Sequence, residues 1–458
     1  MKIVFVSIGM ASTVNLSLEL CRRLVAAGHE VVYVSHVDIE KAVRANGFDF
    51  VRLSADDEMK HRHADAPLAW RDLRAPKRFV DRLRARRRLR RESIANDEVV
   101  RVIEALQPDR IVLDVELHHA MLKLRRLSIP MVLIMGFFSV ARHADVPPLH
   151  TTLFPEAGRR RLRRAWQRLR LETWHFEWRQ RLARWRKCDF HPPVVYDTFD
   201  IDDLRAVAKT WRVSLAREVS RREWLRPYAY RRLPVLCLQA REMDWPVEPP
   251  RNLHYVGAMV HPQRIDTAID EQARARWLAY VEARDSSRPL IYASLGTFWS
   301  ADIAFLRRVI DVFAHRSDWD LVLGLGGTLE PGALEPIPEN ALVLRWAPQL
   351  EVLARADAAI THGGVASINE CLRLAVPMVV YSTGFVEQPG NAARVAHAGV
   401  GIAADKDRDN TADLERNLSR ILTEPTIRER IEAMRKHLLA YEQAATAVKR
   451  IEAAEVVP

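Results

Sequence analysis

The stretch WAPQLEVLARADAAITHGGVASINECLRLAVP, residues 346–377, alternates apolar runs with isolated polar residues. Its apolar run AAIT, residues 358–361, predicts a buried strand, and VASINECLRLA, residues 365–375, predicts a helix. His362, Gly363 and Gly364 lie between the two. Because buried parallel strands are usually continuous runs of Val, Ile and Leu, the polar residues at this junction require a structural reason or a ligand.

The same alternation of strands and helices extends in both directions along the chain. Apolar runs predict strands at 2–7, 29–35, 109–115, 130–136, 289–296, 320–327, 341–346 and 377–382. Helical spacing predicts helices at 15–28, 301–316, 349–356, 390–399 and from 411 to about 455. Such alternation is typical of an α/β fold with doubly wound parallel sheets.

The length of 458 residues favours two domains. The proline-rich stretch DWPVEPPRNLHYVGAMVHP, residues 244–262, is expected to link them. We therefore expect one Rossmann-like domain over 1–250, which includes an Arg- and Trp-rich helical region, and a second over 251–458. Two such domains that face each other across a cleft would form a two-sided site.

Composition indicates a soluble globular protein, with 48% hydrophobic and 28% charged residues. No run of 18 uncharged apolar residues predicts a transmembrane helix. The N-terminal residues predict a strand and not a signal peptide. Four isolated cysteines form no Cys-x-x-Cys pair, which argues against a disulfide framework or a zinc site. A cytoplasmic location is expected.

The net charge of +11 is unevenly distributed. Residues 1–250 carry 47 basic and 32 acidic side chains, whereas residues 251–458 carry 23 and 27. Twelve basic residues fall between Arg159 and Lys187, interleaved with Trp166, Trp174, Trp178 and Trp185. The pattern is compatible with a solvated helix whose tryptophans are buried, or with a cationic surface that contacts anionic lipid at the inner face of a membrane. Nucleic acid is not expected, because no known binding motif accompanies the charge.

The residues that follow the strand at 358–361 are suited to a nucleotide. Glycines allow close approach of the backbone, and the free N–H groups of a helix start attract phosphate. His362 and Ser367 would add hydrogen bonds, Glu370 would accept them from a ribose diol, and Trp346 would stack on a base. Alternatively, Ser367 and Glu370 form a capping box, the glycines form only a turn, and Trp346 belongs to the core.

The motif WAPQ…L…AITHGG…S…E…VP…EQ, from Trp346 to Gln388, closely resembles the nucleotide-binding signature of the UDP-glycosyltransferase superfamily. The resemblance implies the GT-B fold and a UDP- or dTDP-sugar donor. It implies that Trp346 and Gln349 bind the nucleoside and that Glu370 binds the ribose. The diphosphate would contact His362, Gly364, Ser367, and, in the segment ASLGT, Gly296 and Thr297. Glu387 and Gln388 would bind the donor sugar.

Two positions depart from the family pattern. Gln388 follows Pro377 by eleven residues instead of the usual ten. The position of the family's catalytic His, in the loop after the first strand, is occupied by Thr13. A threonine hydroxyl is no base at neutral pH, so Thr13 would at most hydrogen-bond the acceptor.

Asp114 corresponds to the aspartate that orients the catalytic His in the family, and we expect it to act as the base in this chain. Burial would raise its pKa and improve the match. Other candidates in the same half are His118, His119 and His143.

These features together predict an inverting glycosyltransferase that needs no metal and transfers a sugar to a hydrophobic small molecule or lipid. The alternatives are a sugar-nucleotide epimerase of the same fold and a catalytically inactive nucleotide-sugar-binding activator, the latter suggested by Thr13.

Overall fold

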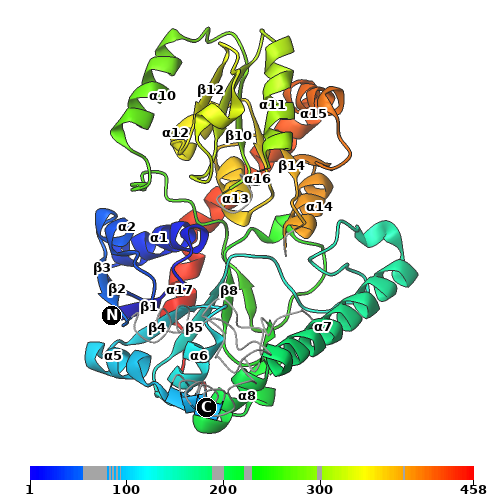
Figure 1. Ribbon diagram of the computed structural model, residues 1–458. Helices are drawn as coiled ribbons and strands as arrows, with labels where there is room; N and C mark the ends of the chain where they lie inside the picture. Colours follow the sequence, from blue (N-terminus) through cyan, green and yellow to red (C-terminus); the bar gives the residue numbers. More distant parts are fainter. Residues whose placement is uncertain are drawn as a thin grey trace.

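The computed structural model describes residues 1–54, 80–187, 201–220, 229–296, 302–384 and 387–457, apart from 82–83, 85–86, 89–90 and 93. Its strands form two parallel sheets that belong to separate lobes (Figure 1).

The first sheet has the order β3-β2-β1-β4-β5-β8-β9, and every printed pairing within it is parallel. Its strands are β1 (Lys2–Val6), β2 (Glu30–Ser35), β3 (Asp49–Arg52), β4 (Arg110–Asp114), β5 (Met131–Met135), β8 (Val235–Cys237) and β9 (Leu253–Tyr255). The central strands are apolar on both faces, as expected for a sheet covered by helices on both sides.

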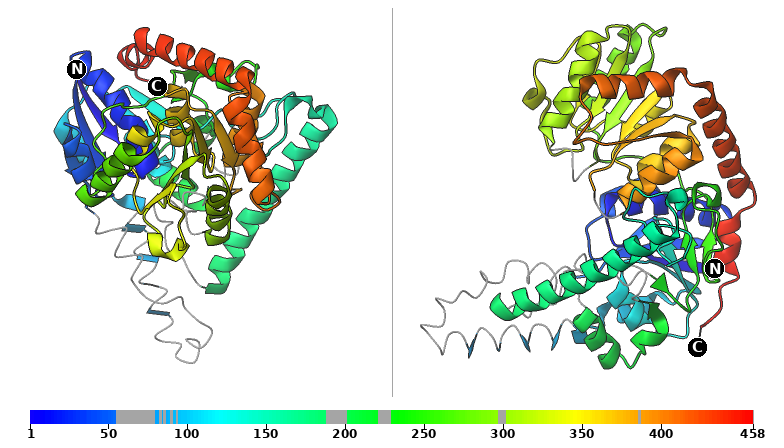
Figure 2. Two further views of the ribbon diagram at one scale, coloured as in Figure 1. Left: turned by 90° about the horizontal axis from the view of Figure 1, so that it is seen from above. Right: turned by 90° about the vertical axis from the view of Figure 1, so that its right-hand side faces the viewer.

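Helices of this lobe surround the first sheet. They are α1 (Ala11–Ala26), α2 (Glu40–Ala45), α5 (Glu98–Leu106), α6 (His118–Leu124), α7 (Arg159–Lys187), α8 (Ile201–Thr210) and α9 (Leu215–Glu218). A two-stranded antiparallel pair, β6 (Val219–Ser220) with β7 (Ala229–Tyr230), lies outside the main sheet. The long helix α7 projects from the body of the lobe (Figure 2).

The second sheet has the order β12-β11-β10-β13-β14-β15, again all parallel. Its strands are β10 (Leu290–Ser294), β11 (Asp320–Gly324), β12 (Ala341–Leu344), β13 (Ala358–Thr361), β14 (Met378–Tyr381) and β15 (Gly401–Ala404). Its helices are α10 (Glu271–Ala283), α11 (Ile303–His315), α12 (Gln349–Leu353), α13 (Val365–Arg373), α14 (Gln388–Ala398), α15 (Thr411–Thr423) and α16 (Pro425–Gln443). This is the doubly wound arrangement that binds ligands beyond the carboxyl ends of its strands.

Two features differ from the predicted domain boundary. The expected linker 244–262 contains β9, which pairs with β8 as the last strand of the first sheet. Helix α17 (Thr446–Glu452) packs against the first lobe, because Ala447, Val448 and Ile451 share a core cluster with β1 and α1. The chain therefore crosses twice between the lobes. The division at residue 250 stays a prediction.

Buried contacts join the two lobes. Arg394 of α14 forms an ion pair with Asp244 at 2.7 Å, and both side chains are buried. A Cβ atom added to Gly390 would lie 1.9 Å from the carbonyl oxygen of Leu149, so α14 contacts the segment after β5 directly. Asn369 of α13 donates a hydrogen bond to the Leu238 carbonyl at 3.2 Å. The sheet edge of the second lobe is thus held against the first lobe.

Candidate functional site

The residues of the predicted nucleotide site lie at one edge of the second sheet. Gly296 and His362 follow the paired strands β10 and β13, Trp346 follows β12, and Gln388 follows β14. Because all four strands are parallel, these residues meet at the carboxyl edge of the sheet. The prediction that they share an edge is confirmed. Thr297, expected beside Gly296, lies outside the residues that the structure describes.

The His362 ring lies between two glycines. A Cβ atom on Gly296 would be 2.7 Å from His362 Cε1, and one on Gly364 would be 2.5 Å from His362 Nε2. Any larger residue at either position would displace the imidazole. Gly296 also has a φ of +74°, which L side chains rarely adopt.

Burial lowers the pKa of His362 to about 4, although a backbone hydrogen bond at Ser294 opposes the shift. The imidazole is therefore neutral at pH 7. Its Nδ1 atom is buried without a hydrogen-bond partner. A neutral ring has one N–H donor, which suits contact with a phosphate oxygen.

Helix α13 begins at Val365, with Gly364 as its N-cap and no side-chain cap. Ser367 is its third residue, so Ser367 and Glu370 do not form a capping box, and this alternative is excluded. The N–H groups of the first turn are left to water or a ligand. The Asn391 side chain of α14 fixes the turn before the helix by donating to the Gly363 carbonyl at 2.8 Å.

Gln349 and Glu370 form a polar network beside this helix start. Gln349 Nε2 donates to Glu370 Oε2, and its Oε1 accepts from the Tyr292 hydroxyl at 2.9 Å. Ser367 Oγ lies 3.4 Å from Gln349 Nε2. Arg264 Nη1 lies 2.5 Å from Glu370 Oε1. The predicted nucleoside and ribose residues are therefore in direct contact.

Tyr292 and Arg264 were not singled out by the sequence. Tyr292 is the central residue of an apolar strand, and Arg264 stands near the end of a segment without periodicity. A polar hydroxyl within the strand LIYAS was the only signal for the first residue. No local pattern marks the second, because its partner is distant in sequence.

Trp346 packs on the glycine turn after β11. A Cβ atom on Gly327 would lie 2.4 Å from the indole ring, and Gly327 has a φ of +80°. Trp346 is partly exposed and does not belong to the core clusters of the second lobe. A partly exposed aromatic ring beside a glycine turn is suited to stack on a flat ligand.

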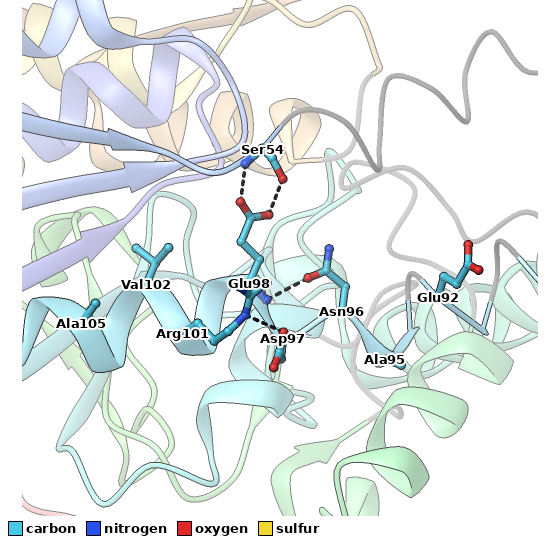
Figure 3. Close-up of a pocket in the computed structure, with 9 residues that line it drawn as sticks. All are labelled: Ser54, Glu92, Ala95, Asn96, Asp97, Glu98, Arg101, Val102 and Ala105. Carbon is cyan, nitrogen blue, oxygen red and sulfur yellow. Dashed lines mark hydrogen bonds and ion pairs between the residues drawn. The ribbon is translucent and has the colours of Figure 1, made fainter.

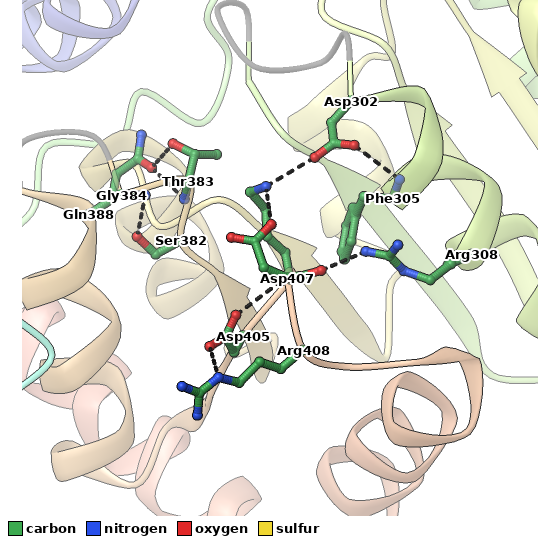
Figure 4. A network of polar contacts seen from close by, with 11 residues as sticks. Asp302, Phe305, Arg308, Ser382, Thr383, Gly384, Gln388, Asp405, Asp407 and Arg408 are labelled. Carbon is green, nitrogen blue, oxygen red and sulfur yellow. Dashed lines mark hydrogen bonds and ion pairs between the residues drawn. The ribbon is translucent and has the colours of Figure 1, made fainter.

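The donor-sugar residues lie at the start of α14. Gln388 is buried, and its Oε1 accepts from Thr383 N at 3.1 Å and Thr383 Oγ1 at 2.6 Å (Figure 4). Its amide nitrogen is thereby oriented, since the oxygen is fixed. Gln388 also lies against Gly363, whose added Cβ would be 3.7 Å from Gln388 Cβ. The binding of the donor sugar by Gln388 stays a prediction. Glu387 is the N-cap residue of α14.

Asp114 ends β4 in the first lobe and is 4% exposed. Its Oδ2 accepts from the Ile8 amide at 2.6 Å, in the loop between β1 and α1. Burial raises the pKa of Asp114 to about 7, against the opposing effect of the Ile8 hydrogen bond. Thr13 lies in the first turn of α1 and donates its hydroxyl to the Met10 carbonyl at 2.9 Å. Asp114 and Thr13 therefore border the same loop.

The alternative bases have other environments. His118 is buried and hydrogen-bonds the Tyr230 hydroxyl through Nδ1, inside the core. Burial lowers the pKa of His119 to about 4. His143 accepts from the Asp145 amide at 3.2 Å in an exposed loop. His118 thus has a structural partner in the core.

Two hollows on the described surface differ in their distance from the predicted nucleotide site. One, about 670 Å³, is lined by α5 and Ser54, and its Glu98 carboxylate already accepts from Ser54 N and Oγ at 2.7 and 2.8 Å (Figure 3). The other, about 540 Å³, includes Arg264, Arg274 and Gln349 and adjoins the predicted nucleotide site. Of the residues that line the second hollow, Arg264 and Gln349 contact Glu370, whereas Arg274 pairs with Glu351.

The described part of the chain contains neither a membrane-spanning helix nor a cluster of metal ligands. No helix there is long and apolar enough to cross a membrane. No group of three or more His, Cys, Asp or Glu side chains there is arranged to hold a metal ion. Independence of metal stays a prediction.

The sequence of the chain is similar to those of known glycosyltransferases. Residues 308–454 match the family model for the C-terminal domain of erythromycin biosynthesis protein CIII-like proteins. The chain is 34% identical over 169 residues to NDP-glycosyltransferase YjiC of Bacillus licheniformis, which is 37% of this chain and 42% of that protein. It is 31% identical to oleandomycin glycosyltransferase of Streptomyces antibioticus, over 38% of this chain and 42% of that protein. The matches thus span less than half the length of these relatives.

Comparisons of structure cover the whole chain. The glycosyltransferase of kitacinnamycin superposes with a TM-score of 0.66 and 23% identity over 100% of this chain and 99% of that one. Glycosyltransferase VinC in complex with dTDP gives a TM-score of 0.60 and 18% identity, over 98% and 99%. These neighbours confirm the predicted GT-B fold. The family model and the sequence relatives support the predicted resemblance to the UDP-glycosyltransferase superfamily.

Proposed function

We propose that this chain is an inverting glycosyltransferase whose second lobe binds a nucleotide-diphosphate sugar. The observation that carries the proposal is the meeting of His362, the α13 helix start and the Gln349–Glu370 network at one sheet edge. A neutral imidazole and free helix N–H groups suit a diphosphate, and a carboxylate beside them suits a ribose diol. Two related sequences that match 37% and 38% of this chain are named glycosyltransferases, which supports the proposal.

The donor in this proposal is a UDP- or dTDP-sugar. Trp346 would stack on the pyrimidine, Gln349 would bind the nucleoside, and Glu370 would accept from the ribose. Gly296, Thr297, Gly364 and Ser367 would border the diphosphate. Glu387 and Gln388 would bind hydroxyls of the sugar. The binding of dTDP by VinC, a structural neighbour, supports this class of nucleotide.

Transfer would proceed by a single displacement. The acceptor oxygen attacks the anomeric carbon while its proton passes to Asp114, directly or through one water. The bond from that carbon to the diphosphate oxygen breaks, and the nucleoside diphosphate leaves with the electron pair. Inversion at the carbon follows from attack opposite to the leaving group. The α13 N–H groups and Ser367 stabilise the departing charge without a metal.

The proposed acceptor is a hydrophobic small molecule or a lipid, bound by the first lobe. Relatives that act in the synthesis of natural products, such as oleandomycin glycosyltransferase, support a small-molecule acceptor. An acidic acceptor, such as a phenol, would reduce the demand on a base as weak as Asp114.

Incubation of the protein with UDP- and dTDP-sugars and a panel of phenolic and lipid acceptors tests the proposal. We expect nucleoside diphosphate release that depends on an acceptor, with a glycosylated product seen by mass spectrometry. An epimerase would instead convert the donor without acceptor. An inactive activator would bind the nucleotide and release nothing, and either outcome would contradict the proposal.

We also propose that α7 attaches the protein reversibly to an anionic membrane surface. Leu162, Trp166 and Leu169 are buried at helical spacing, whereas Leu171, Trp174 and Trp178 are 66%, 62% and 52% exposed on the opposite face. Among the tryptophans of α7 whose side chains the structure describes, Trp166 is buried and donates to the Val146 carbonyl at 2.9 Å, whereas Trp174 and Trp178 are exposed, so the alternative of a solvated helix with buried tryptophans fits Trp166 but not these two.

The exposed apolar face of α7 is flanked by arginines. Within the described part of the helix, Arg160, Arg163, Arg164 and Arg170 form no ion pair, whereas Arg168 pairs with Glu172 at 2.7 Å. Tryptophans amid free cations are typical of a helix that lies in the headgroup region of anionic lipid. Each cation would contribute about 1 kcal/mol near such a surface.

Flotation with phosphatidylglycerol-rich and phosphatidylcholine vesicles tests this proposal. We expect binding to the anionic vesicles alone, weakened by salt, and reduced in the double variant Trp174→Ala/Trp178→Ala. The control Leu278→Ala/Ile303→Ala removes exposed apolar side chains from the other lobe and should bind normally. Absence of binding at low salt, or equal loss in the control, would contradict membrane attachment.

A further inference from the structure

Glu370 is held from two sides. Its Oε1 lies 2.5 Å from Arg264 Nη1, and its Oε2 accepts from Gln349. The Arg264 and Glu370 side chains are only 6% and 3% exposed. A carboxylate buried to this extent requires a counter-charge, because removal of one member of a buried pair leaves an uncompensated charge. Arg264 supplies that counter-charge.

Arg264 belongs to a segment that is also fixed to the first lobe. The next residue, Ile265, donates its N–H to Asn46 Oδ1 at 2.9 Å and accepts from Asn46 Nδ2 at 3.0 Å. Asn46 caps the end of α2, where its Nδ2 also donates to the Ala42 carbonyl at 2.8 Å. One short segment therefore contacts Glu370 of the second lobe through a side chain and α2 of the first lobe through its backbone.

We propose that Arg264 is a positioning residue for the ribose-binding Glu370, and that Asn46 of the other lobe holds Arg264 in place. The inference rests on the proposed nucleotide site. It adds that the nucleotide site of the second lobe is complete only while the first lobe holds the 264–265 segment.

The number of acceptor sites on Glu370 allows Arg264 to orient the carboxylate without competing with the ribose hydroxyls for it. A carboxylate offers about four lone-pair sites over its two oxygens. Arg264 and Gln349 each occupy one, on different oxygens. About two lone-pair sites of the carboxylate therefore remain for hydroxyl donors. The two fixed contacts determine the direction in which these lone pairs point. Without Arg264 the carboxylate would lose both its orientation and its counter-charge.

Calorimetry with UDP and 2′-deoxy-UDP, which differ in one hydroxyl, tests the proposal in the full-length protein. Arg264→Gln should weaken UDP by about 10-fold or more, the value of a hydrogen bond to a charged group, and should weaken 2′-deoxy-UDP less. Glu370→Ala should give the same pattern. Arg264→Lys, which retains the charge, should restore most of the discrimination between the two nucleotides.

A matched control lies in the same hollow. Arg274 forms an ion pair with Glu351, also at 2.5 Å, but its side chain is 58% exposed. Arg274→Gln should leave both affinities unchanged. Normal UDP binding and normal discrimination in Arg264→Gln would overturn the proposal. Failure of the unaltered protein to bind any nucleotide would instead overturn the proposed function.

The contribution of the first lobe needs a second pair of variants. Asn46→Ala should reduce UDP affinity and the discrimination between UDP and 2′-deoxy-UDP in the same direction as Arg264→Gln, although Asn46 contacts only backbone atoms. Arg44→Gln, on the same helix, removes surface contacts with Glu40 and Asp49 and should change neither. Asn46→Ala with unchanged affinities and an unchanged melting temperature would overturn the link to the first lobe.

Discussion

Asp114 and His362 are both buried at strand ends, and burial moves their pKa values in opposite directions. Loss of hydration disfavours the charged form of each group. The pKa of Asp114 rises to about 7, whereas that of His362 falls to about 4. Near neutral pH, His362 is therefore an uncharged donor, and Asp114 exchanges a proton readily. The first property suits binding, and the second suits proton transfer.

Asp114→Asn should reduce turnover by about 10²–10⁴-fold, the usual contribution of a general base, with donor binding intact. The active form of Asp114 is the carboxylate, so turnover of the unaltered protein should rise with pH through about 7. Turnover of the variant should not show this step. Turnover that survives Asp114→Asn but is lost in His119→Ala would transfer the role to His119.

The raised pKa of Asp114 also makes the free energy of unfolding depend on pH. Because the folded pKa of about 7 lies above the ordinary pKa of 3.8 for an aspartate, folded Asp114 binds its proton more tightly than unfolded Asp114. The free energy of unfolding should therefore decrease as pH rises from about 4 to 7. Urea denaturation should show this decrease in the unaltered protein and a smaller one in Asp114→Asn.

Trp346→Ala should weaken UDP and dTDP by similar amounts, about 1–3 kcal/mol, the value of one stacked base. Gly327, which supports the ring, stays unchanged in this variant, so a loss of fold is not expected. Calorimetry with both nucleotides measures the effect. Unchanged affinity for both would mean that the indole only covers the glycine turn.

At the scale of elements, the junctions between strands and helices carry the site. Glycines at these junctions leave space for ring side chains: Gly327 after β11 for Trp346 after β12, and Gly296 after β10 together with Gly364 for His362 after β13. The close approach of these pairs comes from neighbouring parallel strands, which end side by side. The glycines are thus required by the shape of the site as well as by backbone conformation.

Gly364→Ala should weaken nucleoside diphosphate binding, because the added Cβ lies 2.5 Å from His362 Nε2 and must displace the ring. Uridine, which lacks phosphate, should bind with nearly unchanged affinity. Gly332→Ala is the control, since its Cβ would meet nothing closer than 3.9 Å. An equal loss for uridine and UDP would place the effect of Gly364→Ala on the whole site.

The sequence predicted the strands with long apolar runs and missed the short strands β3, β8, β9 and β15. Three of these, β3, β9 and β15, lie at sheet edges, where one side has no partner strand and few residues are buried. The sequence DFVR of β3 has only two apolar residues. Edge strands form because a neighbouring strand is already present, and this information is not local.

The difference between local and non-local information also explains which site residues the sequence predicted and which it missed. Trp346, His362 and Glu370 occur at strand ends or one helical turn later, so their meeting follows from the order of elements. Arg264 reaches Glu370 from a segment without regular structure, 106 positions earlier. Its position depends on how the two lobes pack, which no spacing in the sequence specifies.

At the scale of the whole molecule, contacts between the lobes involve several separate segments. Three contacts join parts of the chain that are distant in sequence: Asp244 with Arg394, Leu149 with Gly390, and Asn46 with Ile265. Helix α17 adds to these by returning to the first lobe (Figure 2).

Removal of residues 446–458 should destabilise the first lobe more than the second. Ile451 is fully buried against that lobe, and Arg125 donates to the Val457 carbonyl at 2.9 Å. Scanning calorimetry should show a lowered transition for the first lobe, while UDP still raises the melting temperature of the second. A uniform shift of a single transition would mean that the lobes unfold as one unit.

Because β1 and α17 share a core cluster, the first lobe cannot complete its core until the end of the chain has been synthesised. The strands β1 to β9 are synthesised first, yet the contribution of Ala447, Val448 and Ile451 to their core is missing until α17 emerges. The second lobe, whose strands and helices α10 to α16 are contiguous, has all its parts before that moment. Domains ordinarily fold in the order of their synthesis. In this chain the first lobe starts to be synthesised before the second lobe but completes its core after it. A nascent chain that stops before α17 would therefore expose to chaperones the apolar residues that α17 covers in the folded protein.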